Sequence, residues 1–477
     1  MPRYRLYNKL NFNQTATYLS INLYVHYNLV LHFMQKLLVH IVMLTMPLIL
    51  WGQNSWTLDF CIEQALNNNI SIQKSRIDQN VSEVSLKQQR GGYQPSVSFS
   101  SGHNYTHTPF PTLGYGYSTS GGGLEADNAV KHHSYSGNIG INLNWTIWNG
   151  SRQPQIEQAR INLRRAGLIT NQMENDIREQ VVQVYTQLLY ATENVNVRQA
   201  MVESSEALRA QGEERLKVGT INKSAYLQLI AQCASDTASL TQAQADLQNQ
   251  QLALLQLMEL PAGTIFTLTD ENDAERIALT EVPLLTEVYD NALSNRPEIR
   301  AAILNQDAAQ YDVKIAKAGY MPSLGLSAGT GTGWRTGTDF TFAEQMKNGW
   351  SNTAGINISV PIWNGRQTKS QVERAKWQEM QSALTYQEQI KSLRKAVETI
   401  WLNATTSQQQ YRSALARLDA VKEAYDILQE QFRIGQKTPT DIMQQRAELI
   451  SAEQQTLQAK YNAYYAQLML RYYSEGL

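Results

Sequence analysis

The chain contains one series of short segments twice, in the same order. Three pairs of segments carry the repeat: Gly92–Val97 and Gly319–Leu324, Ile147–Gly150 and Ile362–Gly365, and Leu216–Gly219 and Phe432–Gly435. The third pair is offset by 216 residues (219 to 435). Solenoid repeats are much shorter, at about 20–50 residues. The pattern therefore predicts a tandem duplication, over residues 53–283 and 284–477, in which each copy reads helix, strand pair, very long helix, helix.

The N-terminal region predicts a secreted protein. Lys36 precedes an apolar run over 37–50, and Gly52 offers a small residue for cleavage, so residues 34–52 read as a signal peptide. We interpret residues 1–33 as the result of a start codon assigned too early; the alternative is a genuine extension of the protein. No apolar run of about 20 residues follows, so we expect only strands to enter a membrane. A net charge of −1 and no basic stripe argue against a nucleic-acid partner.

Strand pairs are predicted over residues 96–148 and 323–362. In Asn138–Trp148, apolar residues at 139, 141, 143, 145 and 147 alternate with Asn, Gly and Thr. This period of two indicates a strand with one apolar and one polar face, long enough to cross a bilayer when tilted. We expect Trp145, Trp148 and Trp363 at the membrane interface. Four strands cannot close a barrel, so spanning requires several chains to share one. The alternative is a soluble sandwich with buried tryptophans.

Neither the histidines nor the cysteines indicate a cofactor. His103, His107, His132 and His133 lie in a predicted loop over residues 102–137. We expect no metal there, because only His103 and His107 have the spacing of a helical ligand pair and they lie in a predicted strand or loop. Cys61 and Cys233 are too few for a disulfide scaffold.

Two segments predict helices far longer than the usual globular length. Residues 152–218 have a proline only in the first turn, and residues 366–434 have no internal proline or glycine. Each would extend roughly 100 Å at 1.5 Å per residue. A helix over 222–260, followed by a connector over 261–283, completes the first copy, and a helix over 438–473 completes the second. Their apolar seams recur every seven residues, which favours coiled-coil packing: Tyr226, Cys233, Leu240, Leu247 and Leu254 in the first, and Ile442, Leu449, Thr456, Ala463 and Leu470 in the second.

The helices are joined by tight turns. Gly219 and Gly435 follow the long helices, where glycine permits a left-handed cap. Asn222 and Thr438 are expected to cap the helices that follow.

Taken together, these features resemble the TolC-type outer-membrane efflux family over residues 56–473. The carriers are Thr57–Asn69, the two Gly-Tyr-x-Pro-Ser segments, the two Ile-Trp-Asn-Gly segments, and the turns at Arg215–Gln228 and Gln431–Gln444. The resemblance implies a mainly α fold with membrane β structure. Three chains would form a homotrimer, with four strands each in a shared twelve-stranded transmembrane β-barrel and the long helices in an α-barrel. It implies an outer-membrane location in a Gram-negative bacterium, with the helical tunnel in the periplasm.

The resemblance also implies partners and site residues. Outer-membrane lipid, a periplasmic adaptor protein and an inner-membrane pump of RND or ABC type would be the partners. The adaptor would contact the turns at Leu216, Val218, Gly219, Phe432, Ile434 and Gly435.

The gate of such a channel would lie beside the second turn. Asp441 and Lys437 match the family's acidic and basic gate positions, whereas Gln444 and Ala225 depart from them. The family's inter-chain salt bridge at the gate cannot be carried over, so a closed state would rest on an Asp441–Lys437 pair or on packing of Phe432. Three Asp441 carboxylates in a narrow mouth would favour cations. A second interpretation, compatible with the first, is an aspartate placed favourably at a helix N-terminus.

The resulting functional prediction is a passive exit duct of a tripartite export system that carries drugs or other small molecules. One alternative is the outer component of a type I protein-secretion system, and another is a periplasmic structural coiled-coil protein. The sequence contains no paired catalytic carboxylates, nucleophile elbow, phosphate loop or zinc motif, so we expect neither an enzyme nor a cofactor.

Overall fold

The computed structural model describes residues 55–107, 109, 133–269 and 273–475. The predicted extension (1–33), the signal peptide (34–52) and His132 lie outside the described residues. The described chain forms two compact units, a small one with residues 55–57 and 263–269 and a main one with 58–262 and 273–475. In the small unit, β1 (Ser55–Trp56) pairs in parallel with β4 (Thr267–Leu268), and the Trp56 ring stacks on Phe266 with centroids 4.1 Å apart. The two repeats thus share one main unit.

Each repeat opens with two helices where the sequence analysis expected one. In the first repeat, α2 (Leu58–Asn68) is followed by α3 (Ile70–Gly91), because Asn69 adopts an extended conformation and its side chain accepts a hydrogen bond from the Ser71 N–H at 2.8 Å. In the second, α7 (Leu285–Asn295) is followed by α8 (Pro297–Lys317). Pro297 disfavours the helical conformation for Arg296, which is extended (φ −67°, ψ 126°). The expected connector contains a short helix, α6 (Ala274–Ala278).

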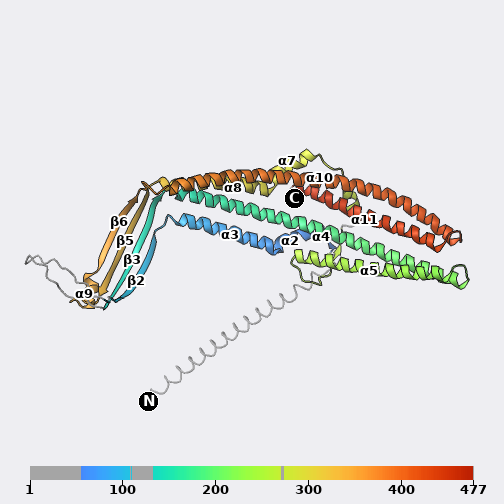
Figure 1. Ribbon diagram of the computed structural model, residues 1–477, viewed down its shortest axis with the longest axis horizontal. Helices are drawn as coiled ribbons and strands as arrows, with labels where there is room; N and C mark the ends of the chain where they lie inside the picture. The colour runs from blue at the N-terminus through green and yellow to red at the C-terminus, as the bar shows by residue number, and fades with distance from the viewer. Residues whose placement is uncertain (1–54, 108, 110–132, 270–272, 476–477) are drawn as a thin grey trace, which may run out of the picture. The chain divides into compact units, whose positions relative to one another are not determined.

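Four strands of the main unit form one antiparallel sheet. They are β2 (Ser96–His107), β3 (His133–Asn149), β5 (Ser323–Arg335) and β6 (Ser351–Ser359), hydrogen-bonded in the order β2-β3-β5-β6, as Figure 1 shows. A short helix, α9 (Phe342–Asn348), packs on β5. The last strand ends at Ser359, three residues before the expected boundary, and Pro361, which cannot donate a ladder hydrogen bond, follows in the chain.

The sheet has one apolar and one polar face, as the alternation predicts. Directly opposed residues point to the same side of a sheet, and the register opposes apolar residues to one another: Val97 to Leu143, Phe99 to Ile141, Leu326 to Trp145 and Ile356. The other face carries Asn, Ser, Thr and Gly. A register shift between Thr146 and Trp148 sets Trp148 opposite Leu324. This bulge turns Trp148 onto the apolar face, whereas strict alternation would have placed it on the polar one.

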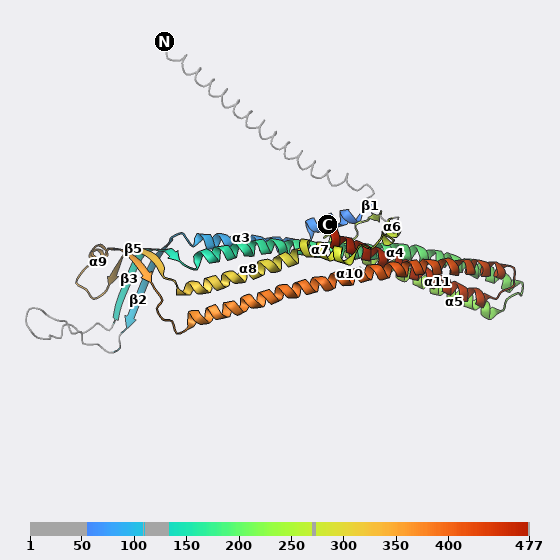
Figure 2. The same cartoon turned by 90° about the horizontal axis from the view of Figure 1, so that it is seen from above.

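The long helices form two hairpins that lie against each other. In the first, α4 (Arg152–Lys217) packs on α5 (Lys223–Leu257), and in the second α10 (Gln367–Arg433) packs on α11 (Pro439–Glu475). Contact between α4 and α11 joins the hairpins. In both views the two hairpin turns lie at one end of the main unit and the sheet at the other (Figures 1 and 2).

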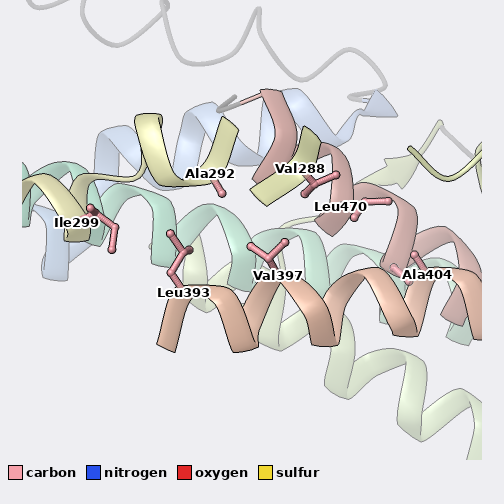
Figure 3. Close-up of a cluster of buried hydrophobic side chains, with 8 residues drawn as sticks. Val288, Ala292, Ile299, Leu393, Val397, Ala404 and Leu470 are labelled. Carbon is pink, nitrogen blue, oxygen red and sulfur yellow. The ribbon is translucent and has the colours of Figure 1, made fainter. Parts of the chain in front are cut away.

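A buried core fixes the second hairpin to the shorter helices. It joins α7, α8, α10 and α11, and its labelled side chains point toward one another in Figure 3: Val288, Ala292, Ile299, Leu393, Val397, Ala404 and Leu470. This core lies along the helices between the sheet and the turns. It therefore fixes the helices that carry the sheet at one end and the turns at the other. No helix in the part of the chain that the structure describes is long and apolar enough to cross a membrane.

Candidate functional site

The candidate site consists of the two hairpin turns, which we call tip 1 (residues 215–225) and tip 2 (residues 431–441). In tip 1, the Gly219 N–H donates to the Leu216 carbonyl at 3.1 Å and the Thr220 N–H donates to the Arg215 carbonyl at 2.9 Å. These two bonds form a Schellman motif, which satisfies carbonyl groups that a helix end leaves open. It requires a left-handed residue, and Gly219 has φ +75°.

Tip 2 repeats this geometry. The Gly435 N–H donates to the Phe432 carbonyl at 3.0 Å, the Gln436 N–H donates to the Gln431 carbonyl at 2.9 Å, and Gly435 has φ +85°. The positive φ explains glycine at both positions, because a side chain strains this conformation. The shared segments that revealed the duplication therefore encode one turn, built twice.

The helix that leaves each tip is capped by a side chain, but by different chemistry. In tip 1, the Asn222 side chain accepts from the Ala225 N–H at 2.8 Å. In tip 2, the Asp441 carboxylate accepts from both the N–H (3.0 Å) and the hydroxyl (2.9 Å) of Thr438, whose hydroxyl in turn accepts from the Asp441 N–H at 3.3 Å. This reciprocal arrangement is a capping box with aspartate as the acid. The bonds from Thr438 lower the pKa of Asp441, and the charge of Lys437 adds to that effect.

The predicted gate residues are only partly brought together. Lys437 and Gln444 are exposed and Asp441 is half-buried. Among the residues that the structure describes, no ion pair joins Lys437 to Asp441, since the carboxylate is bonded to Thr438. Within one chain, Asp441 is bonded in the capping box, and a role of the Asp441–Lys437 pair in a closed state stays a prediction.

Arg215 links tip 1 to tip 2. Its guanidinium lies over the Phe432 ring, 4.2 Å from the centroid, and donates to the Phe432 and Arg433 carbonyls at 2.7 and 3.3 Å. These carbonyls belong to the C-terminal end of α10, where a cation is also favoured by the helix dipole. Phe432 is 2% exposed, in a cluster with Leu208, Leu229, Tyr425 and Ile442.

The predicted contact residues of the tips differ in how far their side chains are exposed to solvent. Val218 is 73% exposed and Ile434 is 54% exposed, and both glycines are exposed. Leu216 is half-buried and Phe432 is buried. Phe432 therefore supports the turns from beneath and adds no surface to them.

A buried ion pair between the hairpins was not predicted from the sequence. Arg446 of α11 forms an ion pair with Asp236 of α5 at 2.9 Å, and the two side chains are only 5% and 9% exposed. Arg446 also donates to the Met201 carbonyl of α4, and the Gln232 amide donates to Asp236 at 2.8 Å. The Arg446 guanidinium and the Asp236 carboxylate each have a further hydrogen-bond partner beside the ion pair, which is the condition under which a buried pair is stable.

The tryptophans and histidines lie at the sheet. The Trp145 indole N–H donates to the Tyr93 carbonyl at 2.8 Å, while Trp148 and Trp363 are 45% and 84% exposed. His103 and His107 lie in β2 and His133 in β3, so the expected loop is shorter than predicted. The rings of His107 and His133 stack across the strands, 4.6 Å apart. Within the described ranges, no three His, Cys, Asp or Glu residues are arranged to hold a metal.

The fold and the tips define a class of protein. A sheet with one apolar face, continued by long helical hairpins that end in paired exposed turns, is the architecture of an outer-membrane export channel. The sequence matches the family described as outer membrane efflux protein over residues 61–259 and 288–474, so the chain belongs to this family and is not an enzyme. The predicted resemblance is confirmed, and with it the location in the outer membrane.

Individual relatives agree with this assignment. The outer membrane efflux protein BepC of Brucella suis is 24% identical over 450 residues, which cover 91% of this chain and 89% of BepC. The proteases secretion protein PrtF of Dickeya chrysanthemi is 20% identical over 90% of this chain and 91% of PrtF. The crystal structure of CusC superposes with a TM-score of 0.72 at 16% identity, over 89% of this chain and 95% of that one.

Proposed function

We propose that three copies of the chain associate head to tail into a closed ring that forms the export duct. The proposal rests on one observation: in the main unit, the strands of the sheet and the helices packed beside one another follow the same order along the chain. The strands follow the order β2-β3-β5-β6, and the helices pack in the order α3, α4, α8, α10. Both layers therefore end in the same chain segments, β2 with α3 on one side and β6 with α10 on the other. Joining unlike edges generates a ring when the rotation closes.

The helical edges carry apolar side chains suited to such an interface. On α3, Ile77, Val81 and Val84 are 58–61% exposed, and on α10, Trp377 and Leu384 are 69% and 62% exposed. Rows of this kind on a monomer mark an interaction surface. A neighbouring copy that sets its α10 against α3 would cover both rows at once.

The sheet edges support the same assembly. Val97, Phe99, Ile356 and Ile358 on the apolar face are 65–71% exposed, as lipid-facing side chains would be. Lipid does not tolerate unpaired strand edges, so β2 would pair with β6 of the next copy to give a twelve-stranded barrel. Trp148 and Trp363 would then lie at the membrane interface.

The exposed surface of the tips is the proposed contact for a periplasmic adaptor. Val218 and Ile434 are exposed apolar residues beside Gly219 and Gly435, and the two turns lie at the same end of the main unit. An inner-membrane pump of RND or ABC type would supply both cargo and energy, and the duct itself would be passive. Asp441, brought together in three copies, would make the mouth cation-preferring.

Small molecules are the proposed cargo. The efflux family and the similarity to BepC over most of both chains favour this assignment. The second candidate is protein export by a type I secretion system, which the similarity to PrtF favours. Drug susceptibility and protease secretion of a deletion strain separate the two, because each cargo predicts a defect in one assay only.

The experiment that tests the assembly combines mass and conductance. We expect the purified protein to have the mass of a trimer in detergent and to form discrete channels in a planar bilayer. Ile77→Glu at the α3 edge should dissociate the trimer, because it buries a charge in the interface. Ile303→Glu, on the inner helix α8 and 41% exposed, is the matched control and should leave the trimer intact. A monomer that never conducts would overturn the proposal.

A further inference from the structure

A polar cavity lies where α4, the start of α8 and the end of α11 meet. Its volume is about 280 Å³, and its walls include three arginines, Arg178, Arg296 and Arg300, together with Tyr472 and Tyr473. Neither the tips nor the strands contribute to it. Guanidinium groups and phenol hydroxyls are hydrogen-bond donors, so the donor set favours an acceptor as the occupant.

The arginines are held by different contacts. Arg296 is fixed: it pairs with Glu179 at 3.1 Å, and its guanidinium lies 3.5 Å from the Tyr473 ring centroid and 5.0 Å from that of Tyr472. Arg300 is exposed and has no ion-pair partner among the described residues.

The nearby carboxylates are largely engaged elsewhere. Glu174, which also lines the cavity, pairs with Arg76 at 3.0 Å, and Glu298 lies 4.0 Å from Arg296. Glu179 is engaged in its ion pair with Arg296. Among the described residues, none of these carboxylates forms an ion pair with Arg300.

The N-terminus of α8 adds to this arrangement. The helix has 21 residues and begins at Pro297, and no side chain caps it at Arg296. Arg296, Pro297 and Arg300 line the cavity, so the positive end of the α8 dipole lies beside it, in the same turn as the Glu298 carboxylate. Helix N-termini of this kind bind anions.

The Tyr472 hydroxyl provides an independent indication of a ligand. Tyr472 is 8% exposed, and its hydroxyl has no hydrogen-bond partner in the part of the chain that the structure describes. Buried polar groups normally have partners. Burial raises the pKa of this phenol, so it keeps its proton and can donate it.

We propose that this cavity binds a small oxyanion, a phosphate group or a carboxylate, through Arg178, Arg300, the α8 N-terminus and the Tyr472 hydroxyl. Arginine suits both groups because its planar fork can donate two parallel hydrogen bonds. Bound there, the anion would connect α4, α8 and α11 beside the ion pair between Arg296 and Glu179. The proposal is independent of the cargo and of the assembly.

Calorimetric titration of the purified full chain with inorganic phosphate tests the proposal, at constant ionic strength against chloride. Acetate and glycerol 3-phosphate serve as second probes and distinguish a carboxylate, a free phosphate and a lipid-type headgroup. We expect saturable binding of at least one probe, weakened about tenfold by Arg300→Gln, because the variant loses charge-assisted hydrogen bonds to the anion. Tyr472→Phe, which removes the hydroxyl and keeps the ring, should weaken probe binding by a smaller factor.

Arg412→Gln is the matched control, because Arg412 is an exposed arginine of α10 outside the cavity. It should bind the probe as the unaltered chain does. Saturable binding that Arg300→Gln and Tyr472→Phe both reduce, in proteins with unchanged thermal stability without phosphate, supports the site. Absence of saturable binding for all three probes, or equal binding by all variants, overturns it.

Discussion

The two tips have the same backbone and different side-chain contacts. Both end in a Schellman motif around a glycine with positive φ, and an offset of 216 residues superimposes them. Yet Arg215, which holds tip 2, corresponds to Gln431, and the capping acid Asp441 corresponds to Ala225. The buried pair Asp236–Arg446 likewise has no counterpart, since the equivalent positions are Ala452 and Ile230.

The difference indicates which features of a duplicated unit remain fixed. The turn is determined by local chain geometry, so both copies need the same residue at the same place. The contacts that join the copies differ, because different side chains occupy the equivalent positions. Substitutions in the turn should therefore affect both tips equally, and substitutions in the joining contacts should affect one copy only.

The largest difference in stability loss between equivalent substitutions in the two repeats is expected at Arg446. Arg446→Ala leaves Asp236 buried without its partner, which costs about 3–5 kcal/mol of stability. Ile230→Ala, at the equivalent place in the first repeat, should cost much less because Ile230 is 38% exposed. Urea unfolding of the purified protein, followed by circular dichroism, measures both.

The double variant Arg446→Met with Asp236→Leu provides the control for this prediction. Replacing both charges by apolar groups of similar size is often neutral, so the double variant should recover most of the loss. If it is as unstable as the single variant, the cost arises from packing and not from the unpaired carboxylate.

A second asymmetry is expected directly beneath the turns. Phe432→Ala opens a cavity in the cluster of tip 2 and should cost about 3–5 kcal/mol. Leu216→Ala, at the equivalent position in tip 1, should cost less than half of that, since Leu216 is half-buried. The same unfolding measurement applies, and equal losses would show that the two tips are packed alike after all.

Features governed by local sequence were predictable, and features governed by contact between distant segments were not. Residues 366–434 lack internal glycine and proline, and α10 spans Gln367–Arg433. The seven-residue seam of α11 has four of its five members buried. On α5, by contrast, the row at Leu229, Asp236 and Ala243 is more buried than the predicted seam, because α4 determines which flank is covered.

The missed features have identifiable physical causes. The break at Arg296 was signalled by Pro297, since proline at a first helical position marks a start. The bulge at Trp148 depends on the register of β5, and the Asp236–Arg446 pair joins residues 210 positions apart. Neither leaves a signal in the local sequence. The Thr438–Asp441 spacing did contain the capping box, which fits the interpretation of Asp441 as a favourable residue at a helix N-terminus.

The turn glycines should respond equally in the two tips. Gly219→Val and Gly435→Val each force a β-branched residue to positive φ, which costs about 1–2 kcal/mol. An added Cβ meets nothing within 4 Å at either position, so the cost comes from the backbone alone. Gly→Asn at the same positions is the control, because asparagine tolerates this conformation. Minimum inhibitory concentrations in a strain that relies on this duct report export, and a defect in only one tip would contradict equivalence.

The smallest expected effect is at Asp441, where Asp441→Asn should change ion selectivity more than stability. Asparagine also caps helices, so unfolding should hardly change. Because the folded-state pKa of Asp441 is lowered, its stabilising contribution is present above the unfolded carboxyl pKa and is lost only as the pH falls through the lower folded value. Cation preference, read from reversal potentials in planar bilayers, should therefore be constant from about pH 5 to pH 8 and fall in Asp441→Asn.

Ala225→Asp gives the complementary test in tip 1. It creates an acid at the equivalent position, where Asn222 already caps the helix through the Ala225 N–H. If a ring of carboxylates at this level controls the mouth, Ala225→Asp should raise cation preference and restore part of it in Asp441→Asn. If Asp441 acts only as a cap, neither substitution should move the reversal potential. The asymmetry of the tips would then concern the folding of α11 and not the passage of ions.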